Sequence, residues 1–197
     1  MGMNDANGPQ LAQWLLIRVF IPEEKKVVQT FLPYPGFRKS ASVLDNKRLG
    51  KQRVESKQLL LALGVPVGEH TPKEKSSWAN HPCAKMWAGH EMGLIAYSIC
   101  ICDEWIVRGY RDTLREQFLQ AVTDVCQPVI KQFMKTGVTP ESCERLFMKP
   151  SWLGNHIFHA SHRSNLLRKD PEHYGQFNWN EPDDLDYVWP IRDQHIL

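Results

Sequence analysis

A stripe of four polar residues follows one face of the segment 43–64, VLDNKRLGKQRVESKQLLLALG. At about 100° per residue, Asp45, Arg48, Gln52 and Glu55 fall within an arc of roughly 80° on a helix. The same face continues into the leucines that end the segment. The charged part of the stripe therefore lies on the face that is buried further along, where charges must be paired or must line a cavity.

The stripe has two interpretations. In the first, Asp45 with Arg48, or Gln52 with Glu55, forms a structural network that fixes the neighbouring loops. In the second, the stripe lines a cleft in which one carboxylate lies among cations, and its ionisation is tuned for chemistry. In that case we expect Glu55 to be the catalytic carboxylate, while Arg48 and Arg53 position phosphate or tune the carboxylate.

The charges of the chain are distributed unevenly. The formal net charge is only +2, but basic residues dominate the segment 37–57, where Lys47 and Lys51 flank the stripe. Acidic residues dominate the last twenty positions. This asymmetry indicates either one face for an anion or two solvated faces of opposite sign.

A second cluster, HIFHASHRSNLLRKDPEHY, covers residues 156–174. Its three histidines recur every third residue, which suits a metal site in spacing, but Asp170 is the only nearby acid before Pro171. A phosphate-contacting surface or a solvated basic turn explains the cluster better. The DNA contacts predicted here are His162, Arg163, Asn165, Arg168 and Lys169.

His81 precedes Pro82 at the predicted start of a long helix, a position that favours an anion. Its side chain is either a phosphate contact or a helix cap. We include His81 among the predicted DNA contacts, together with Lys47, Lys51 and Gln52.

The elements that position these residues are predicted to be helices. Capping and turn signals favour a helix from Ser40 or Ser42 to Gly64, with Gly64 as the residue after its end. Three further helices are predicted over 83–107, 112–135 (kinked or split at Pro128) and 143–149, and one helical turn over 156–168. The predicted fold is mainly α, a compact single-domain helical bundle with a long irregular C-terminal segment.

Composition limits the class of protein. Hydrophobic residues make up 42% and charged residues 23% of the 197 residues, which are globular values. Five cysteines without a C-x-x-C pair indicate a reducing compartment. No apolar run approaches the ~20 residues that cross a bilayer. We therefore expect a cytoplasmic protein without a membrane partner, organised as an N-terminal extension (1–27, or a start assigned too early) and one domain (28–197).

Several stretches resemble the pyrimidine-dimer DNA glycosylase (endonuclease V-type) family. They are VQTFLPYPGF, SVLDNKRLGKQRVESKQLL, NHPCAKMWAGHEMGLIAYSI, WIVRGYRDT and WLGNHIFHASHRSNLLRKDPEHY. The family residues are matched by Asp45, Arg53 with Glu55, His81, Arg108-Gly109-Tyr110 and Asp112-Thr113. The family's Arg and Glu are adjacent, whereas Val54 separates them here.

The resemblance implies a compact helical domain without a metal or organic cofactor. It also implies that an α-amine attacks C1′ of a damaged nucleotide, that a glutamate stabilises the sugar cation, and that β-elimination then cuts the strand. In this chain the amine is either that of the processed N-terminus or a lysine such as Lys47 or Lys51.

The resulting hypothesis is a DNA glycosylase, with or without abasic-site lyase activity, that excises a damaged or modified pyrimidine from double-stranded DNA. We expect it to act as a monomer. One alternative is a non-catalytic DNA- or RNA-binding protein that uses the same basic surfaces. Another is a metal-dependent hydrolase built on the histidines of 156–162.

Overall fold

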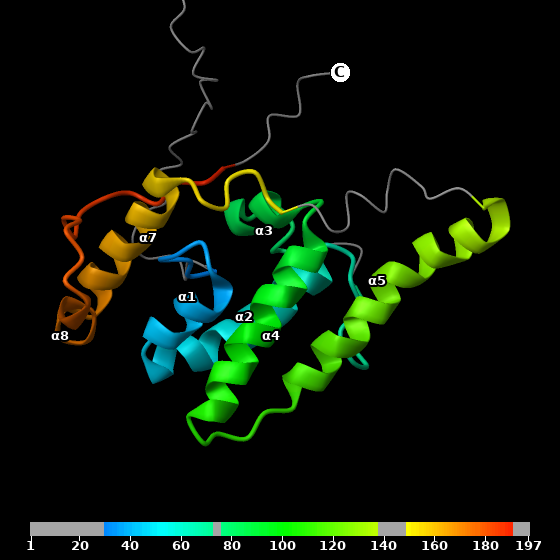
Figure 1. Cartoon of the computed structure of the whole chain (residues 1–197), viewed down its shortest axis with the longest axis horizontal. Coiled ribbons are helices and arrows are strands. Elements are labelled where there is room, and N and C mark those ends of the chain that lie inside the picture. The colour runs from blue at the N-terminus through cyan, green and yellow to red at the C-terminus, as the bar shows by residue number, and fades with distance from the viewer. Residues whose placement is uncertain (1–29, 73–75, 138–148, 191–197) are drawn as a thin grey trace, which may run out of the picture.

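The computed structural model describes residues 30–72, 76–137 and 149–190, which are mainly helical (Figure 1). These residues form seven α-helices, one 3₁₀ helix and no β-strand, apart from an isolated bridge between Val67 and His70. The helices are α1 (Phe37–Val43), α2 (Asn46–Ala62), α3 (Pro82–Trp87), α4 (Glu91–Val107), α5 (Leu114–Thr136), α7 (His156–Lys169), α8 (Pro171–Tyr174) and η1 (Gly175–Phe177). The predicted mainly helical class is confirmed.

Helix α4 lies at the centre of the bundle and packs against α1, α2 and α5. Figure 1 shows α7 and α8 together on one side of this group and α5 on the other, extending beyond it. The largest fully buried side chains come from all these parts, among them Leu32, Leu49, Leu59, Trp87, Tyr97, Phe118, Phe158, Tyr174 and Trp189. One core therefore joins α2, which carries the polar stripe, to the segments before and after it.

Helix α2 ends where the sequence predicts but begins later. Gly64 follows its end with a φ of +86°, a conformation that glycine adopts readily. The predicted start at Ser40 or Ser42 is wrong, because the backbone is extended at Leu44 and Asp45. The Asp45 side chain accepts a hydrogen bond from Arg48 N (3.0 Å) and so caps α2.

The long apolar helix predicted over 83–107 is interrupted. Pro82 starts α3 as predicted, but Gly89 adopts a φ of +77° and separates α3 from α4. Arg108 then caps α4, so the predicted C-terminal boundary is confirmed. Both α3 and α4 pack against α2.

The later part of the chain is more helical than predicted. Helix α5 runs through Pro128 instead of splitting there. Residues 156–169 form the four-turn helix α7, where a single helical turn was predicted, while 178–190 are irregular as expected. Residues 143–148 of the predicted short helix lie outside the described residues.

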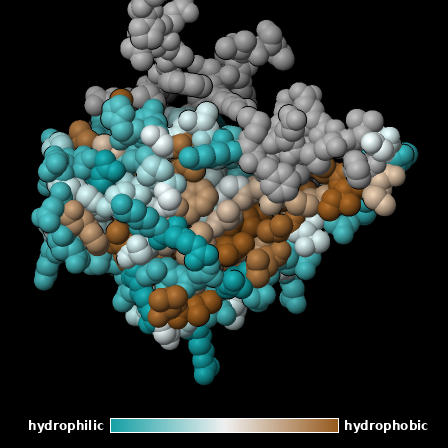
Figure 2. Space-filling view, viewed as in Figure 1, coloured by the Kyte–Doolittle hydropathy of each residue, from teal (hydrophilic) through white to brown (hydrophobic). Residues whose placement is uncertain are grey.

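Figure 2 shows a mainly hydrophilic surface over α1, α7 and α8 and a hydrophobic patch along α5. Ile130 and Met134 of α5 are 56% and 78% exposed. Among the helices in the described ranges, none is long and apolar enough to cross a bilayer.

Candidate functional site

Two side chains of its own helix hold the buried carboxylate of Glu55. Gln52 Nε2 donates to Glu55 Oε2 (2.9 Å), and Lys51 Nζ lies 3.1 Å from Glu55 Oε1. The Glu55 side chain is 8% exposed and that of Lys51 is 51% exposed. The carboxylate therefore links an interior amide to an ammonium group that water and ligands can reach.

The orientation of the Gln52 amide is fixed by two donors. Its oxygen accepts hydrogen bonds from Phe31 N (3.1 Å) and Tyr97 Oη (2.7 Å), so its NH₂ group must face Glu55. Burial raises the pKa of Tyr97 well above its usual value, and the negative charge of Glu55 adds to this rise. The Tyr97 hydroxyl therefore stays protonated and serves as a donor.

The segment that supplies Phe31 is itself anchored on both sides. Leu32 N donates to His162 Nδ1 (3.2 Å), and Leu32 O accepts from His159 Nδ1 (2.7 Å). Trp87 Nε1 donates to Thr30 Oγ1 (2.9 Å). The first described residues therefore lie beside the Gln52–Glu55 pair, although they are more than twenty positions away in sequence.

The two buried histidines of α7, His159 and His162, are neutral and form hydrogen bonds with backbone groups. His159 Nε2 accepts from Gly154 N (3.0 Å), so both of its ring nitrogens are engaged. Burial lowers the pKa of His159, and it lowers that of His162 well below the usual value. Within the described parts of the chain, no group of three or more His, Cys, Asp or Glu side chains is arranged to hold a metal ion.

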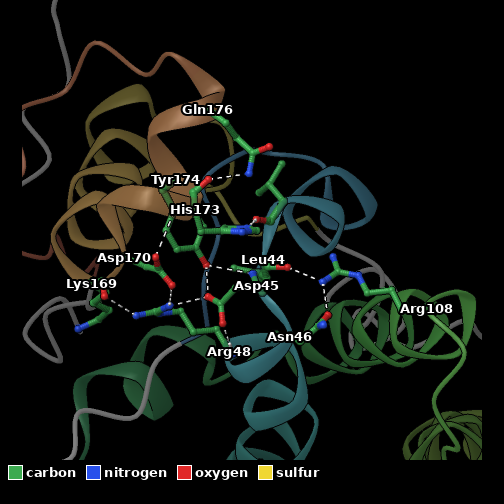
Figure 3. Close-up of polar contacts among 11 residues, drawn as sticks. Leu44, Asp45, Asn46, Arg48, Arg108, Lys169, Asp170, His173, Tyr174 and Gln176 are labelled. Atoms are coloured by element: carbon green, nitrogen blue, oxygen red, sulfur yellow. Dashed lines mark hydrogen bonds and ion pairs between the residues drawn. The ribbon is translucent and has the colours of Figure 1, made fainter.

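Arg48 belongs to a second network, which joins the start of α2 to α7 and α8 (Figure 3). Its guanidinium donates to Asp45 Oδ2 (2.5 Å), Asp170 Oδ2 (3.4 Å) and Lys169 O (3.0 Å). Tyr174 Oη donates to the same Asp45 oxygen (2.6 Å). The polar stripe is therefore divided between a structural network at Asp45 and Arg48 and a carboxylate site at Gln52 and Glu55.

The pKa directions at Asp45 and Arg48 follow from these contacts. Burial opposes the charged form of Asp45, but hydrogen bonds from Tyr174 and Arg48 outweigh it and lower the Asp45 pKa. Burial likewise opposes the charge of Arg48, and its hydrogen bond to Asp45 raises the Arg48 pKa despite it. Both residues therefore stay charged over the physiological range of pH.

Arg53 points to a different part of the molecule. Its Nε pairs with Asp112 Oδ2, and the Asp112 side chain is fully buried. Its guanidinium also lies 4.8 Å from the centre of the Trp105 ring. These contacts attach α2 to α4 and to the start of α5, and the structure does not bring Arg53 together with Lys51 and Glu55 as one group.

The predicted contacts on α7 divide into inward and outward side chains. Arg163 donates to Pro33 O (2.7 Å) and to Glu181 Oε1, and buried Asn165 donates to Leu185 O (2.9 Å). Arg168 and Lys169 are exposed, as are Lys47 and Lys51 of α2. The exposed cations are therefore the members of the predicted set that are available to a ligand.

His81 caps α3. Its Nδ1 accepts from Cys83 N (3.1 Å), and its ring lies edge-on to Trp189 at 6.0 Å. Burial lowers the pKa of His81. Of the two roles considered for this residue, the cap is therefore present, while a phosphate contact stays a prediction.

Tyr187 is a neighbour of the site that the sequence did not indicate. Lys169 Nζ lies 6.0 Å from its ring centre, and its ring lies 5.6 Å from that of His162. Burial raises the pKa of Tyr187; the charges of Arg168 and Arg48 oppose the rise and that of Glu55 adds to it. The cations of α7 and the Glu55 carboxylate therefore act on one side chain.

Comparison with known families adds to this geometry. Residues 28–117 match a family model described as Pyrimidine dimer DNA glycosylase. These residues, 90 of the 197, are therefore similar to that family, in agreement with the predicted resemblance. No curated protein and no solved structure matches the chain. The part that matches the glycosylase family contains Lys51, Gln52, Glu55 and Tyr97, whereas α7 and α8 lie outside it.

Proposed function

We propose that this protein is a DNA glycosylase that excises a damaged or modified pyrimidine from double-stranded DNA. The observation that carries the proposal is the buried Glu55 carboxylate, held by Gln52 and reaching the surface through Lys51. The family matched over 28–117 is named for the same activity. This match supports an enzyme that acts on DNA.

The exposed cations suit the proposed substrate. Lys47, Lys51, Arg168 and Lys169 supply positive charge on the elements that adjoin Glu55 and Tyr187. Phosphate contacts of this kind fix the register of a duplex and supply much of its binding free energy. They also repay the cost of unstacking a nucleotide so that its sugar reaches a protein side chain.

The role of Glu55 follows from the charge that the reaction creates. When the C1′–N bond breaks and the base leaves with the bonding electrons, positive charge develops on the deoxyribose ring. A carboxylate that is already oriented stabilises that charge in a site from which water is excluded. Gln52, fixed by Phe31 N and Tyr97 Oη, keeps the carboxylate in place without neutralising it.

The test is cleavage of the C1′–N bond in ultraviolet-irradiated duplex DNA, measured as abasic sites that alkali converts to strand breaks, against unirradiated duplex. We expect Glu55→Gln to lower the rate at least about 100-fold, because it keeps the shape and removes the charge. The matched control is Glu116→Gln, since the Glu116 side chain is 80% exposed on α5.

Two outcomes contradict the proposal at different levels. Full activity of Glu55→Gln would show that the site is assigned wrongly. Tight DNA binding by the wild-type protein without any new abasic site would favour the non-catalytic DNA-binding alternative.

A further inference from the structure

Lys51 and Glu55 form a pair that spans the boundary between solvent and core. They lie one turn apart on α2, with Lys51 Nζ 3.1 Å from Glu55 Oε1. Half of the Lys51 side chain is exposed, while the carboxylate is almost fully covered. A DNA strand that covers this surface therefore meets the amine first and finds the carboxylate directly behind it.

We propose that Lys51 Nζ is the nucleophile of an abasic-site lyase reaction, which forms an imine with C1′ of the opened deoxyribose. The inference rests on the proposed function, because glycosylase action leaves an abasic sugar whose open form carries an aldehyde at C1′. Primary amines of lysine react with such carbonyl groups to give Schiff bases. The reaction needs no cofactor beyond the two side chains.

The amine must lose its proton before it attacks, and the pair provides a route. DNA that covers Lys51 and Glu55 removes the water that hydrates both charges, which penalises the charged form of each. Transfer of one proton from Lys51 Nζ to Glu55 Oε1 neutralises both groups at once. The contact of 3.1 Å makes this transfer direct.

The imine then forms with balanced atoms and charges. The lone pair of Nζ forms the N–C1′ bond while the C1′=O π bond breaks, and the oxygen atom leaves as water. That water takes one of the two protons of the neutral amine and the proton held by Glu55, while the other amine proton stays on nitrogen. The products are a protonated imine on Lys51, water and the Glu55 carboxylate.

Strand cleavage follows from the same pair. The Glu55 carboxylate takes a proton from C2′, the electrons of that C–H bond move toward the imine nitrogen, and an enamine forms. The C3′–O bond then breaks, and the 3′ phosphate leaves as an anion. No oxidant or reductant takes part in this step.

A second lysine of the same helix, Lys57, is placed differently. Lys57 Nζ contacts His70 Nδ1 (3.1 Å) and Gln117 Oε1 (2.8 Å), next to α5. It therefore offers a matched control, an amine of α2 that has its own partners away from Glu55.

The experiment is borohydride trapping of the full-length protein on a duplex that carries one preformed abasic site. Borohydride reduces the C=N bond to a stable secondary amine, so a covalent protein–DNA adduct accumulates, and peptide mapping locates it. We expect the adduct at Lys51, a loss of at least about 100-fold in Lys51→Arg, and no change in Lys57→Arg. Arginine keeps the charge beside Glu55 and cannot form the imine.

The outcomes separate this inference from the proposed function. An adduct mapped to any other amine, an undiminished adduct in Lys51→Arg, or no adduct with the wild-type protein overturns the role of Lys51. Formation of alkali-labile abasic sites in irradiated DNA by the wild-type protein is scored separately and tests the glycosylase itself. Because the duplex used for trapping already contains its abasic site, the adduct can form without glycosylase activity. The glycosylase result likewise does not depend on the adduct.

Discussion

Among single residues, Tyr174 and Tyr187 show how differently a buried hydroxyl group can contribute to the stability of the fold. Tyr174 is fully buried; its hydroxyl donates to Asp45 Oδ2 (2.6 Å) and accepts from Asp45 N (3.2 Å). The buried Tyr187 hydroxyl has no hydrogen-bond partner among the residues that the structure describes. A buried polar group without a partner loses its hydration and gains nothing in return.

We therefore expect opposite results from the same substitution at these two positions. Tyr174→Phe removes a hydrogen bond to a charged group and should lower the free energy of unfolding by about 1.5 to 3 kcal/mol. Tyr187→Phe removes an unsatisfied hydroxyl and should leave that free energy unchanged or raise it. Urea denaturation of both variants beside the wild type measures the difference.

A comparable loss of stability in Tyr187→Phe would contradict this account, because it would show that the hydroxyl has a partner in solution. Equal stability of Tyr174→Phe and the wild type would show that the Asp45 contact contributes nothing.

At the scale of elements, Arg108 joins the end of α4 to the end of α1. Its guanidinium donates to Leu44 O (2.6 Å), Ser42 O (3.1 Å) and Asn46 Oδ1 (3.0 Å). It also donates to Glu104 Oε1 (2.8 Å). The planar guanidinium thereby satisfies the carbonyl groups at the turn between α1 and α2, which would otherwise lack donors.

Arg108→Lys tests this connection. Lysine keeps the charge but presents a point charge instead of a planar fork, so we expect unfolding to become easier by roughly 1 to 3 kcal/mol. The control is Arg111→Lys, since Arg111 is exposed three positions later. Thermal melts followed by circular dichroism compare the two, and equal melting temperatures would argue against a structural role of Arg108.

The ends of elements were predictable where one residue type decides them. Gly64, Pro82 and Arg108 mark boundaries at the predicted positions. The breaks at Asp45 and Gly89 were not predicted. The predicted helix contains Asp45 as part of the charged stripe, although aspartate is a favourable residue for capping a helix. A single glycine in an apolar run, such as Gly89, is not by itself sufficient to predict that a helix ends.

The site was predictable where it depends on one helix. The spacing of Gln52 and Glu55 indicated their contact, because residues three apart share a helix face. The donors Phe31 N and Tyr97 Oη were missed, since they come from other segments and depend on how α4 packs on α2. For the same reason, the sequence could not show that the Arg163 side chain points inward, toward Pro33 O and Glu181.

At the scale of the whole molecule, α7 connects the beginning and the end of the described chain. His159 and His162 bind the backbone of Leu32, while the Ser161 and Ser164 hydroxyls accept from Val188 N (3.2 Å) and Leu185 N (2.9 Å). Segments far apart in sequence are thus held on one helix by uncharged side chains. Protonation of the histidines should therefore loosen the molecule as a whole.

The stability of the protein should fall as the pH drops below the usual histidine pKa of about 6.5. The folded-state pKa values of His159 and His162 are lowered by burial, so the unfolded chain binds more protons in this range. The stabilisation is fully present above pH 6.5 and is lost as the pH falls toward the folded-state values. From pH 7 to pH 5.5 we expect a decrease of about 1.5 to 3 kcal/mol in the free energy of unfolding.

His162→Gln should reduce this pH dependence by about 1.4 kcal/mol per pH unit below 6.5, because one titrating group is removed from the unfolded chain. His156→Gln is the control for general effects, since His156 is exposed at the start of α7. Urea denaturation at pH 7 and pH 5.5 gives the difference for each variant. If the wild-type protein were equally stable at both pH values, or if the two variants behaved alike, the backbone contacts of the buried histidines would not depend on their neutral form.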